Sequence, residues 1–334
     1  MKRAARLATL AAACGLAFAG ALAASCCASA EPPEVKAEAE APEEAPKRAK
    51  TTKAELEFAT SNADGFTPMP KPEPGDWLHR FKEPGQTFAE YVRSRPPGPT
   101  KKRTQLVLQP IGKFTETQRA RLEEIRAFAA LWFALPVELS KKAFPLPVSN
   151  RRERTWGEKK WTQYETGYFL NRLAERLPAD AIACQGITMA DLYPEESWNY
   201  VFGQASLVER VGVYSLARYG PEFWGLERDE AAGRLELLRS IKVVTHESGH
   251  MFGLMHCKRH LCNMNGSNSL AETDLQPLAL CPECLKKLQW RIGFDVRERY
   301  EALAAFYEKA GLADEAVWVK KRLARIGEEA TAAE

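Results

Sequence analysis

The chain has 334 residues, of which 45% are hydrophobic and 27% are charged, a balance typical of a globular protein. This composition excludes a collagen, a fully disordered chain and a protein with many membrane spans. The formal net charge of +3 comes entirely from Lys2, Arg3 and Arg6, so residues 31–334 carry as many bases as acids. A neutral chain has no general electrostatic attraction to nucleic acid, and we expect no nucleic-acid partner.

Residues 1–30 have the pattern of an export signal, because the basic start is followed by an uncharged run rich in Ala and Leu from Leu7 to Ala24. We predict a signal peptide that is cleaved after Ala30, where Ala28–Ala30 forms an A-x-A site. A lipid on Cys26 is the alternative, since the residues before it form an imperfect lipoprotein cleavage box. In either case we expect the protein to be exported, to the periplasm or beyond the cell. It would contact a membrane only through a lipid on Cys26.

The composition changes after the signal. Residues 31–75 are rich in Glu, Ala, Pro and Lys and nearly lack aromatic side chains, so we expect a disordered tether. Residues 76–326 follow without a second linker of this kind, and we predict a single domain there. The last residues, 327–334, are expected to be a disordered tail.

Apolar patterns within the domain predict strands alternating with helices. The expected strands are Thr104–Ile111, Ala181–Thr188, Asn199–Leu207 and Val208–Leu216. The expected helices are Thr115–Phe133, Thr162–Leu177, Arg228–Phe252 and an antiparallel pair across a Gly turn, Arg297–Lys309 and Asp314–Ile326. This order indicates a mixed α/β sheet.

The helix that precedes Gly253 carries the first chemical signal. His246 and His250 are four residues apart, so they project from one helix face a turn apart, as two ligands of one metal ion do. Glu247 lies about 100° round the helix, near such an ion without having to bind it. Gly253 can end the helix with positive φ, and His256 follows three residues later. The stretch HESGHMFGLMH is the extended zinc-binding form found in metzincin peptidases.

Zinc with three neutral ligands keeps one position for water and lowers the pKa of that water from ~15.7 to ~7. Glu247 would take the proton, which makes a nucleophile at neutral pH. We therefore predict a zinc-dependent metallopeptidase, with the three histidines on a catalytic zinc and Glu247 as general base. The alternative is an exported binding or scaffold protein that needs zinc for stability and cleaves little. The presence of Glu247 favours the enzyme.

Four cysteines follow the third histidine in the pattern C-x4-C and C-x2-C, with 18 residues between the pairs. They are Cys257, Cys262, Cys281 and Cys284. This spacing is typical of a four-cysteine structural zinc site. Two disulfides are the alternative, because an exported protein enters an oxidising compartment. Zinc is favoured because a C-x2-C pair makes a strained disulfide but suits the geometry of a zinc ion. Cleavage after Ala30 would also leave five cysteines, an odd number, so that Cys184 stays unpaired.

Together these motifs resemble the archaemetzincin (archaelysin) family, whose hallmark is the extended zinc motif joined to C-x4-C-x-M and C-x2-C. The resemblance extends upstream through Glu83–Tyr91, Gly186–Tyr193 and Phe202–Tyr219. It implies a compact metzincin-like mixed α/β domain with a small twisted mixed sheet, a long active-site helix and a four-cysteine zinc knuckle. It also implies two zinc ions per chain, Met264 as the Met-turn residue beneath the catalytic zinc, and a peptide substrate aligned along the edge strand near Asn199–Ser206.

We expect a monomer that acts on peptides or proteins. These motifs do not specify the physiological substrate. They are equally compatible with cleavage inside a chain and with removal of amino-terminal residues. They also assign no residue to the stabilisation of the oxyanion.

Overall fold

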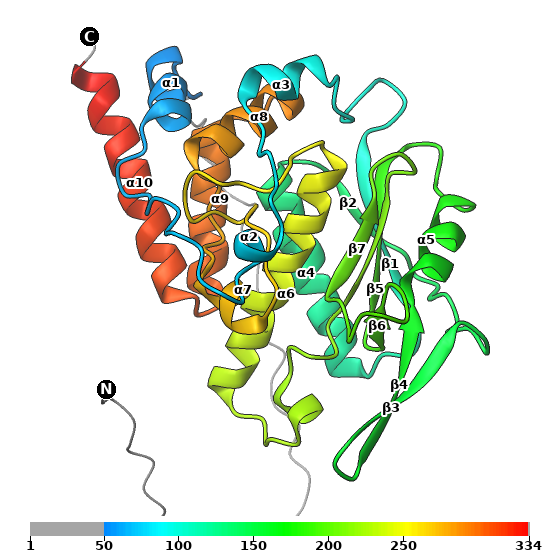
Figure 1. Ribbon diagram of the computed structural model, residues 1–334. Helices are drawn as coiled ribbons and strands as arrows, with labels where there is room; N and C mark the ends of the chain where they lie inside the picture. The colour runs from blue at the N-terminus through cyan, green and yellow to red at the C-terminus, as the bar shows by residue number, and fades with distance from the viewer. Residues whose placement is uncertain (1–49, 333–334) are drawn as a thin grey trace, which may run out of the picture. The chain divides into compact units, whose positions relative to one another are not determined.

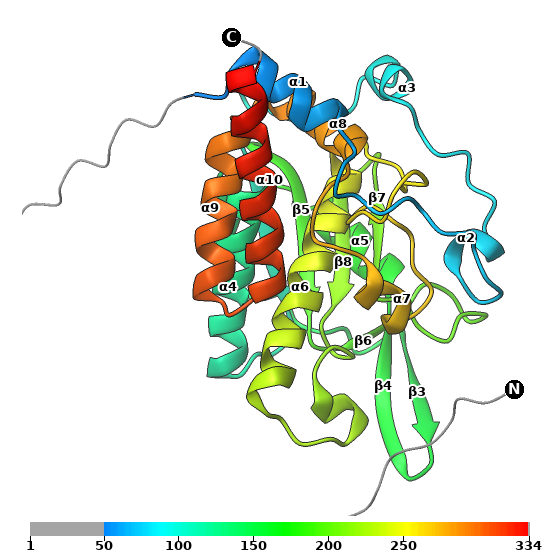
Figure 2. The same cartoon turned by 90° about the vertical axis from the view of Figure 1, so that its left-hand side faces the viewer.

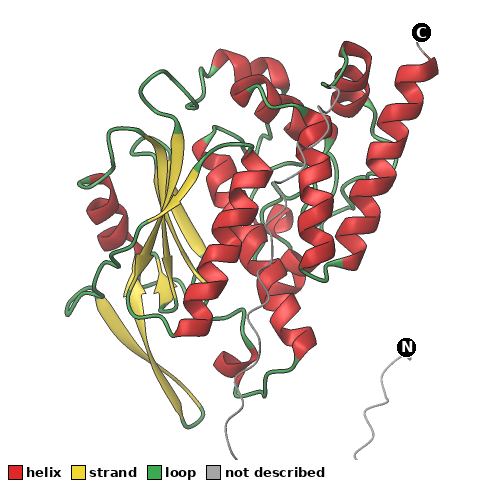
Figure 3. Cartoon of the chain, turned by 180° about the vertical axis from the view of Figure 1, so that it is seen from behind, coloured by secondary structure: helices red, strands yellow, loops and turns green. Residues whose placement is uncertain are grey.

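A computed structural model describes residues 50–332, and its fold is mixed α/β, as predicted (Figures 1 and 3). The predicted signal peptide, Cys26 and most of the first half of the predicted tether lie outside the described residues. The elements in chain order are α1 (Lys53–Ser61), α2 (Trp77–Arg80), α3 (Phe88–Arg93), β1 (Gln105–Ile111), α4 (Glu116–Phe133), β2 (Val137–Leu139), β3 (Arg151–Trp156), β4 (Lys159–Glu165), α5 (Thr166–Ala174), β5 (Ala181–Thr188), β6 (Asp191–Tyr193), β7 (Gly203–Ser206), β8 (Val211–Ser215), the 3-10 turn η1 (Pro221–Trp224), α6 (Glu230–Met251), α7 (Leu270–Leu275), α8 (Pro282–Ile292), α9 (Val296–Lys309) and α10 (Ala313–Ala332).

Five strands form the larger sheet in the order β2-β1-β5-β8-β7. The first four run parallel, and β7 runs antiparallel to β8 at one edge. All eight residues of β5 are buried, as expected for a central parallel strand covered on both faces. The predicted strand Ala181–Thr188 is therefore confirmed with its boundaries.

Helices cover both faces of this sheet (Figure 1). On one face Phe169 and Leu173 of α5 pack against Val107 and Val213 of the strands. On the other face the long helices α4 and α6 form the main core with the opposite side of the strands. The sheet thereby fixes the direction of α6, which carries the predicted zinc motif.

A smaller sheet joins β3, β4 and β6. The β3 and β4 strands form an antiparallel hairpin, and β6 adds parallel to β4. The predicted helix Thr162–Leu177 is therefore wrong in its first turn, since residues 162–165 belong to β4 and the helix begins at Thr166. Long-range pairing with two neighbouring strands outweighs the helical spacing of the apolar residues there.

The start of the ordered domain also differs from the predicted boundary at residue 76. Residues 50–75 lie on the domain, and α1 packs beside α8 and α10 (Figure 2). Thr52 and Glu55 form a capping box that starts α1, and Ala59 is fully buried. Arg322 of α10 donates hydrogen bonds to carbonyl oxygens at the end of α1, including 2.8 Å to Asn62. The composition of residues 50–75 does not reveal that they are ordered, because this segment adds only a few side chains to a core that other elements form.

The C-terminal helix pair is confirmed as α9 and α10, which lie side by side (Figure 2). Helix α10 extends to Ala332, so the predicted tail at residues 327–334 is mostly a continuation of the helix. Among residues 50–332, no helix is both long and apolar enough to span a bilayer.

Candidate active site and metal centres

Helix α6 and the turn after it position the predicted catalytic residues. Asp229 caps the first turn of α6, accepting a hydrogen bond from the N–H of Ala232. The helix ends at Met251, and Gly253 turns the chain with a φ of +81°. A Cβ at Gly253 would also lie 2.6 Å from the Cβ of Pro96. Both the positive φ and this close approach require glycine here.

The three predicted zinc ligands converge in space. The ring centroids of His246 and His250 lie 4.7 Å apart, and that of His256 lies 5.3 Å and 4.9 Å from them. The Nε2 atoms of His246 and His250 are 3.1 Å apart. One ring nitrogen from each of the three residues lies within 4.8 Å of the others.

Hydrogen bonds fix the tautomer of the two helical histidines. The Nδ1 of His246 lies 2.7 Å from the carbonyl oxygen of Asn263, and that of His250 lies 2.6 Å from the carbonyl oxygen of Leu254. A carbonyl oxygen can only accept, so each Nδ1 must carry the hydrogen. Burial lowers the pKa of His246 well below its usual value and that of His250 to about 4, which keeps both rings neutral. Their Nε2 atoms therefore present lone pairs to the centre of the cluster.

His256 takes its partner from a distant segment. Its Nδ1 lies 2.8 Å and 2.9 Å from the two carboxylate oxygens of Glu83, which precedes α3. The ring of Trp77 packs edge-on against His256, with centroids 5.2 Å apart. Burial raises the pKa of Glu83, but the hydrogen bond to His256 and smaller interactions with the surrounding side chains together outweigh burial and hold the pKa below its usual range. Sequence analysis did not identify Glu83 or Trp77 as site residues; its one signal was that Glu83 begins a stretch resembling the family.

The side chain of Glu247 lies against the edge strand β7. A Cβ at Gly203 of β7 would be 3.1 Å from Oε1 of Glu247 and 3.1 Å from the Cβ of Tyr214. A larger residue at Gly203 would therefore displace the carboxylate. Withdrawal from water raises the pKa of Glu247 to about 7, and the nearby His256 opposes the shift only in part. A carboxylate with a pKa near neutrality can both accept and return a proton.

The predicted Met-turn residue packs against the same helix. Met264 is fully buried, and a Cβ at Gly249 would lie 2.6 Å from its sulfur atom. The glycine between His246 and His250 therefore lets Met264 reach the helix backbone. This close contact explains why the zinc motif has a glycine in the last turn of α6, where glycine otherwise costs stability.

The four predicted cysteine ligands also assemble into one cluster. All are buried and free, and their sulfur atoms lie within 4.8 Å of one another. The sulfur atoms of Cys257 and Cys281 are 3.6 Å apart, well beyond a disulfide bond. Cys281 occupies the position before the first residue of α8, and Cys284 lies in the first turn of that helix, where hydrogen bonds with the other three cysteines raise its pKa. Hydrogen bonds from the other cysteines hold the pKa of Cys257 far below its usual value, whereas burial raises that of Cys262.

One turn connects the two clusters. The carbonyl oxygen of Asn263 accepts from His246, as described above. Two residues later, Oδ1 of Asn265 accepts from the N–H of Cys262 at 2.7 Å, and Nδ2 donates to the carbonyl oxygen of Cys257 at 2.8 Å. The turn that contains Met264 therefore holds both a histidine ring and the cysteine loop in place.

A cleft of about 700 Å³ opens over the histidines. Glu247 and all three predicted zinc ligands line it. Its lining also includes aromatic and apolar side chains, among them Trp77, Trp198, Tyr200, Leu207 and Met255. Other lining residues are polar, among them Lys242, Asn268, Thr273 and Gln276. The cleft thus offers both apolar and polar contacts beside the metal-ligand cluster.

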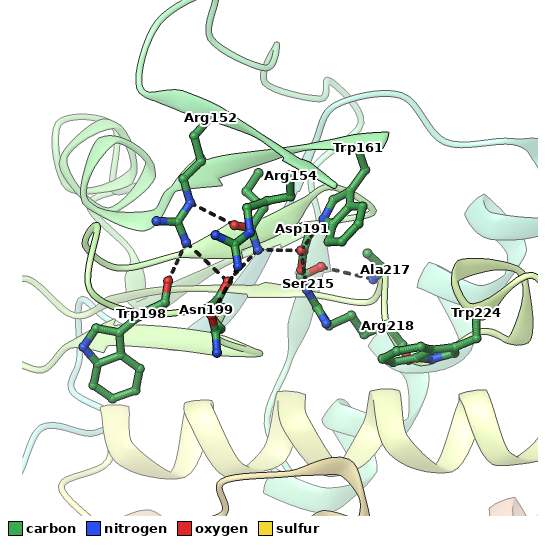
Figure 4. A network of polar contacts seen from close by, with 11 residues as sticks. Arg152, Arg154, Trp161, Asp191, Trp198, Asn199, Ser215, Ala217, Arg218 and Trp224 are labelled. Atoms are coloured by element: carbon green, nitrogen blue, oxygen red, sulfur yellow. Dashed lines mark hydrogen bonds and ion pairs between the residues drawn. The ribbon is translucent and has the colours of Figure 1, made fainter. Parts of the chain in front are cut away.

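A polar network holds the loop between β6 and β7 (Figure 4). This loop carries the cleft residues Trp198 and Tyr200. Arg152 of β3 donates to the carbonyl oxygen of Trp198. Arg218 forms a buried two-point ion pair with Asp191, with N···O distances of 2.8 Å and 2.7 Å. The Arg218 guanidinium also lies 3.7 Å from the centroid of the Tyr200 ring. The smaller sheet therefore braces the aromatic wall of the cleft.

Comparisons with known proteins agree with this site. The sequence pattern described as peptidase family M54 matches residues 164–290, which include both clusters. Archaemetzincin-2 of Macaca fascicularis is 37% identical over 277 residues, covering 74% of this chain and 76% of that protein. Archaemetzincin-2 of Homo sapiens is also 37% identical, over 281 residues, with the same shares. The crystal structure of the archaemetzincin from Methanopyrus kandleri is 28% identical and covers 58% of this chain and 97% of that one, with a TM-score of 0.46.

The fold and the site define a metallopeptidase of the α/β class, as the sequence predicts. The chain belongs to the archaemetzincin family, which is peptidase family M54. The resemblance drawn from the sequence motifs is thereby confirmed.

Proposed function

We propose that this protein is a zinc-dependent peptidase that hydrolyses peptide bonds in the cleft, with His246, His250 and His256 as ligands of a catalytic zinc and Glu247 as general base. The observation that carries the proposal is the convergence of the three histidines beside one carboxylate in an open cleft. Family membership supports the same conclusion.

The histidine cluster has the donor set of a catalytic zinc site. Three imidazole nitrogens are typical protein ligands of such a site, with one position left for water or substrate. Two nitrogens bound tetrahedrally at the usual Zn–N distance would be about 3.3 Å apart, and the Nε2 atoms of His246 and His250 are 3.1 Å apart. Each Nδ1 faces an oxygen atom, as is usual for metal-binding histidines.

The chemistry divides between the metal and Glu247. Zinc bound at this site would act as a Lewis acid on the scissile carbonyl and lower the pKa of water. Glu247 takes a proton from the attacking water and then gives it to the nitrogen that leaves as an amine. Its carboxylate thus returns to its starting state in each cycle. The pKa of about 7 suits both transfers near neutral pH.

The edge strand β7 is the proposed guide for the substrate. It pairs with β8 on one side, and no strand of the described chain pairs with its other side. An extended peptide can add to such an edge through main-chain hydrogen bonds. The contact between Gly203 of β7 and Glu247 would bring that peptide close to the general base.

We propose that the four cysteines bind a second, structural zinc. Sulfur atoms held tetrahedrally at the usual Zn–S distance are about 3.8 Å apart, close to the 3.6 Å between Cys257 and Cys281. A closed set of four buried sulfur ligands is typical of structural rather than catalytic zinc.

Export through residues 1–30 also belongs to the proposal, with cleavage after Ala30 and a lipid on Cys26 as the alternative. The basic start and the uncharged run that follows support it. The protein would act outside the cytoplasm, as a monomer, on peptides or proteins. The mass of the mature amino terminus distinguishes a chain that begins at Glu31 from one that carries a lipid at Cys26.

The decisive experiment compares the mature protein with its Glu247→Ala variant by native mass spectrometry and by peptide hydrolysis. We expect two zinc ions and reduced cysteines in both proteins, and a rate lower by about 10²–10⁴-fold in the variant. Glu123→Ala, on the exposed side of α4, serves as the matched control.

An unchanged rate in Glu247→Ala would contradict the mechanism. One zinc together with the mass loss of two disulfides would replace the cysteine site by crosslinks. Two zinc ions without any hydrolysis by the parent protein would favour the binding or scaffold alternative.

A further inference from the structure

Lys242 is a buried cation in the wall of the cleft. Its side chain is 4% exposed, and the residue lines the cleft together with the histidines. It lies on α6 four residues before His246 and therefore on the same helix face. Its Nζ donates to the carbonyl oxygens of Thr273 and Asp274, at 3.2 Å and 3.3 Å. These bonds use two of the three hydrogens of the ammonium group.

The ammonium group of Lys242 forms no direct ion pair in the described chain. Asp274 and Glu315 attract it and Arg239 repels it, but neither acid forms an ion pair with it within residues 50–332. Both oxygens of Asp274 accept from Arg239, at 2.9 Å and 2.6 Å. Burial raises the pKa of Glu315 and lowers that of Lys242, and the attraction between the two groups opposes both shifts. Burial of an uncompensated ammonium is costly, so an anion at this position would be favoured.

The acids of the cleft lining are engaged elsewhere. Glu83 binds His256, and Glu247 lies beside β7. Glu195 accepts from the indole N–H of Trp198 at 3.0 Å. The residues that line the cleft near the carbonyl groups bonded to Lys242 are uncharged, such as Thr273 and Gln276. This part of the cleft therefore combines one cation with neutral hydrogen-bonding groups.

We propose that Lys242 forms a carboxylate-binding subsite, so that the enzyme prefers peptides carrying an acidic side chain or a free carboxyl terminus next to the scissile bond. This inference rests on the proposed peptidase function. Four residues of helix span about 6 Å, and an extended peptide advances about 3.3 Å per residue. The carboxylate would therefore lie within about two residues of the bond that is cut.

The test uses matched peptides with Glu or Gln at each position within two residues of the scissile bond, and matched peptides with a free or an amidated carboxyl terminus. We expect kcat/KM to be about tenfold higher for the carboxylate at one position, equivalent to about 1.4 kcal/mol. In Lys242→Gln this ratio should fall close to one, because glutamine can still donate to the carbonyl groups but has no charge. A preference in the Glu and Gln pair identifies an acidic side chain, and one in the terminal pair identifies a carboxyl terminus.

Lys287→Gln is the matched control, because Lys287 is also buried and donates to a backbone carbonyl, that of Gln86, but does not line the cleft. It should keep the preference of the parent. If Lys242→Gln fails to fold, Lys242→Arg keeps the charge and should keep the preference. The proposal is overturned if the parent shows no preference for a carboxylate, if Lys242→Gln retains it, or if Lys242→Arg loses it while still cleaving neutral peptides.

Binding separates this proposal from the proposed function. The affinity of the same peptide pairs is measured by fluorescence polarisation on the Glu247→Ala variant, with and without Lys242→Gln. One outcome is that the parent hydrolyses no peptide, while the carboxylate peptides bind about tenfold more tightly and this difference depends on Lys242. In that case the peptidase function fails and the subsite stands. Equal binding of the members of each pair overturns the subsite.

Discussion

The histidine cluster and the cysteine cluster adjoin each other in the chain, at His256 and Cys257, but the protein encloses them differently. The three histidines are half-buried and face a cleft of about 700 Å³. The four cysteines are at most 7% exposed. The first arrangement leaves room for a substrate beside an incomplete ligand set, and the second surrounds its ligands completely. Access, rather than ligand number alone, separates a site built for chemistry from one built for stability.

The two clusters also draw on different parts of the molecule. The cysteine loop is held by a neighbouring residue, Asn265, and by the first turn of α8. The histidines depend on partners from separate segments, including Glu83, which is 173 positions away from His256. Changes around the histidines should therefore alter activity first, whereas changes around the cysteines should alter folding first.

Removal of metal by a chelator should give the largest effect and should separate the two clusters. Because the histidines face solvent, we expect a chelator to take the first equivalent of zinc and abolish hydrolysis while the far-ultraviolet circular dichroism stays that of the folded protein. The second equivalent should leave only under denaturing conditions or much later. Zinc release followed with a colorimetric indicator alongside activity checks this order, and simultaneous loss of both equivalents would contradict it.

Replacing Cys281 and Cys284 together by Ser should remove the second zinc and destabilise the fold. Metal binding by a structural site contributes directly to folding, so we expect a loss of at least about 3 kcal/mol, or about 6–12 °C in Tm. The buried Cys184, which lies outside the cluster, provides the control as Cys184→Ala. If the double variant melts like the parent, the structural role of the cysteine cluster is wrong.

Glu83→Gln should weaken the catalytic zinc without unfolding the protein. The amide can accept the hydrogen bond of His256 but cannot supply the negative charge that raises the basicity of its ring. We expect metal affinity to fall by about 10–100-fold, measured by competition with a chelator of known strength. Glu90→Gln, an exposed capping residue of α3, should leave this affinity as it is.

Gly203→Ala should have the smallest effect, because it moves the general base without touching a metal ligand. The new Cβ would press on Glu247 and on Tyr214 at 3.1 Å each. We expect kcat to fall by about tenfold, with unchanged zinc content, since misplacement of a catalytic group by a fraction of an ångström is already costly. Gly167→Ala on α5, where a Cβ would have ordinary contacts, is the control, and equal rates in the two variants would refute the positional role of Gly203.

The sequence by itself determined the short-range geometry of this protein. A helical period places His246 and His250 on one face, and Gly253 returns the chain so that His256 can reach them. The spacing of the cysteines likewise predicted a single cluster. These inferences hold because the groups concerned are joined by short stretches of chain whose conformation local rules restrict.

Tertiary packing decided everything that joins distant segments. Residues 50–75 lack the composition of a core, yet α1 docks on a core that α8 and α10 already form. The partners of the histidine rings, the contact of Gly203 with Glu247 and the position of Lys242 in the cleft all depend on how α6 lies against the sheet and against the N-terminal segment. No residue spacing specifies such contacts, because they arise from the combined burial of many side chains rather than from the geometry of any one element.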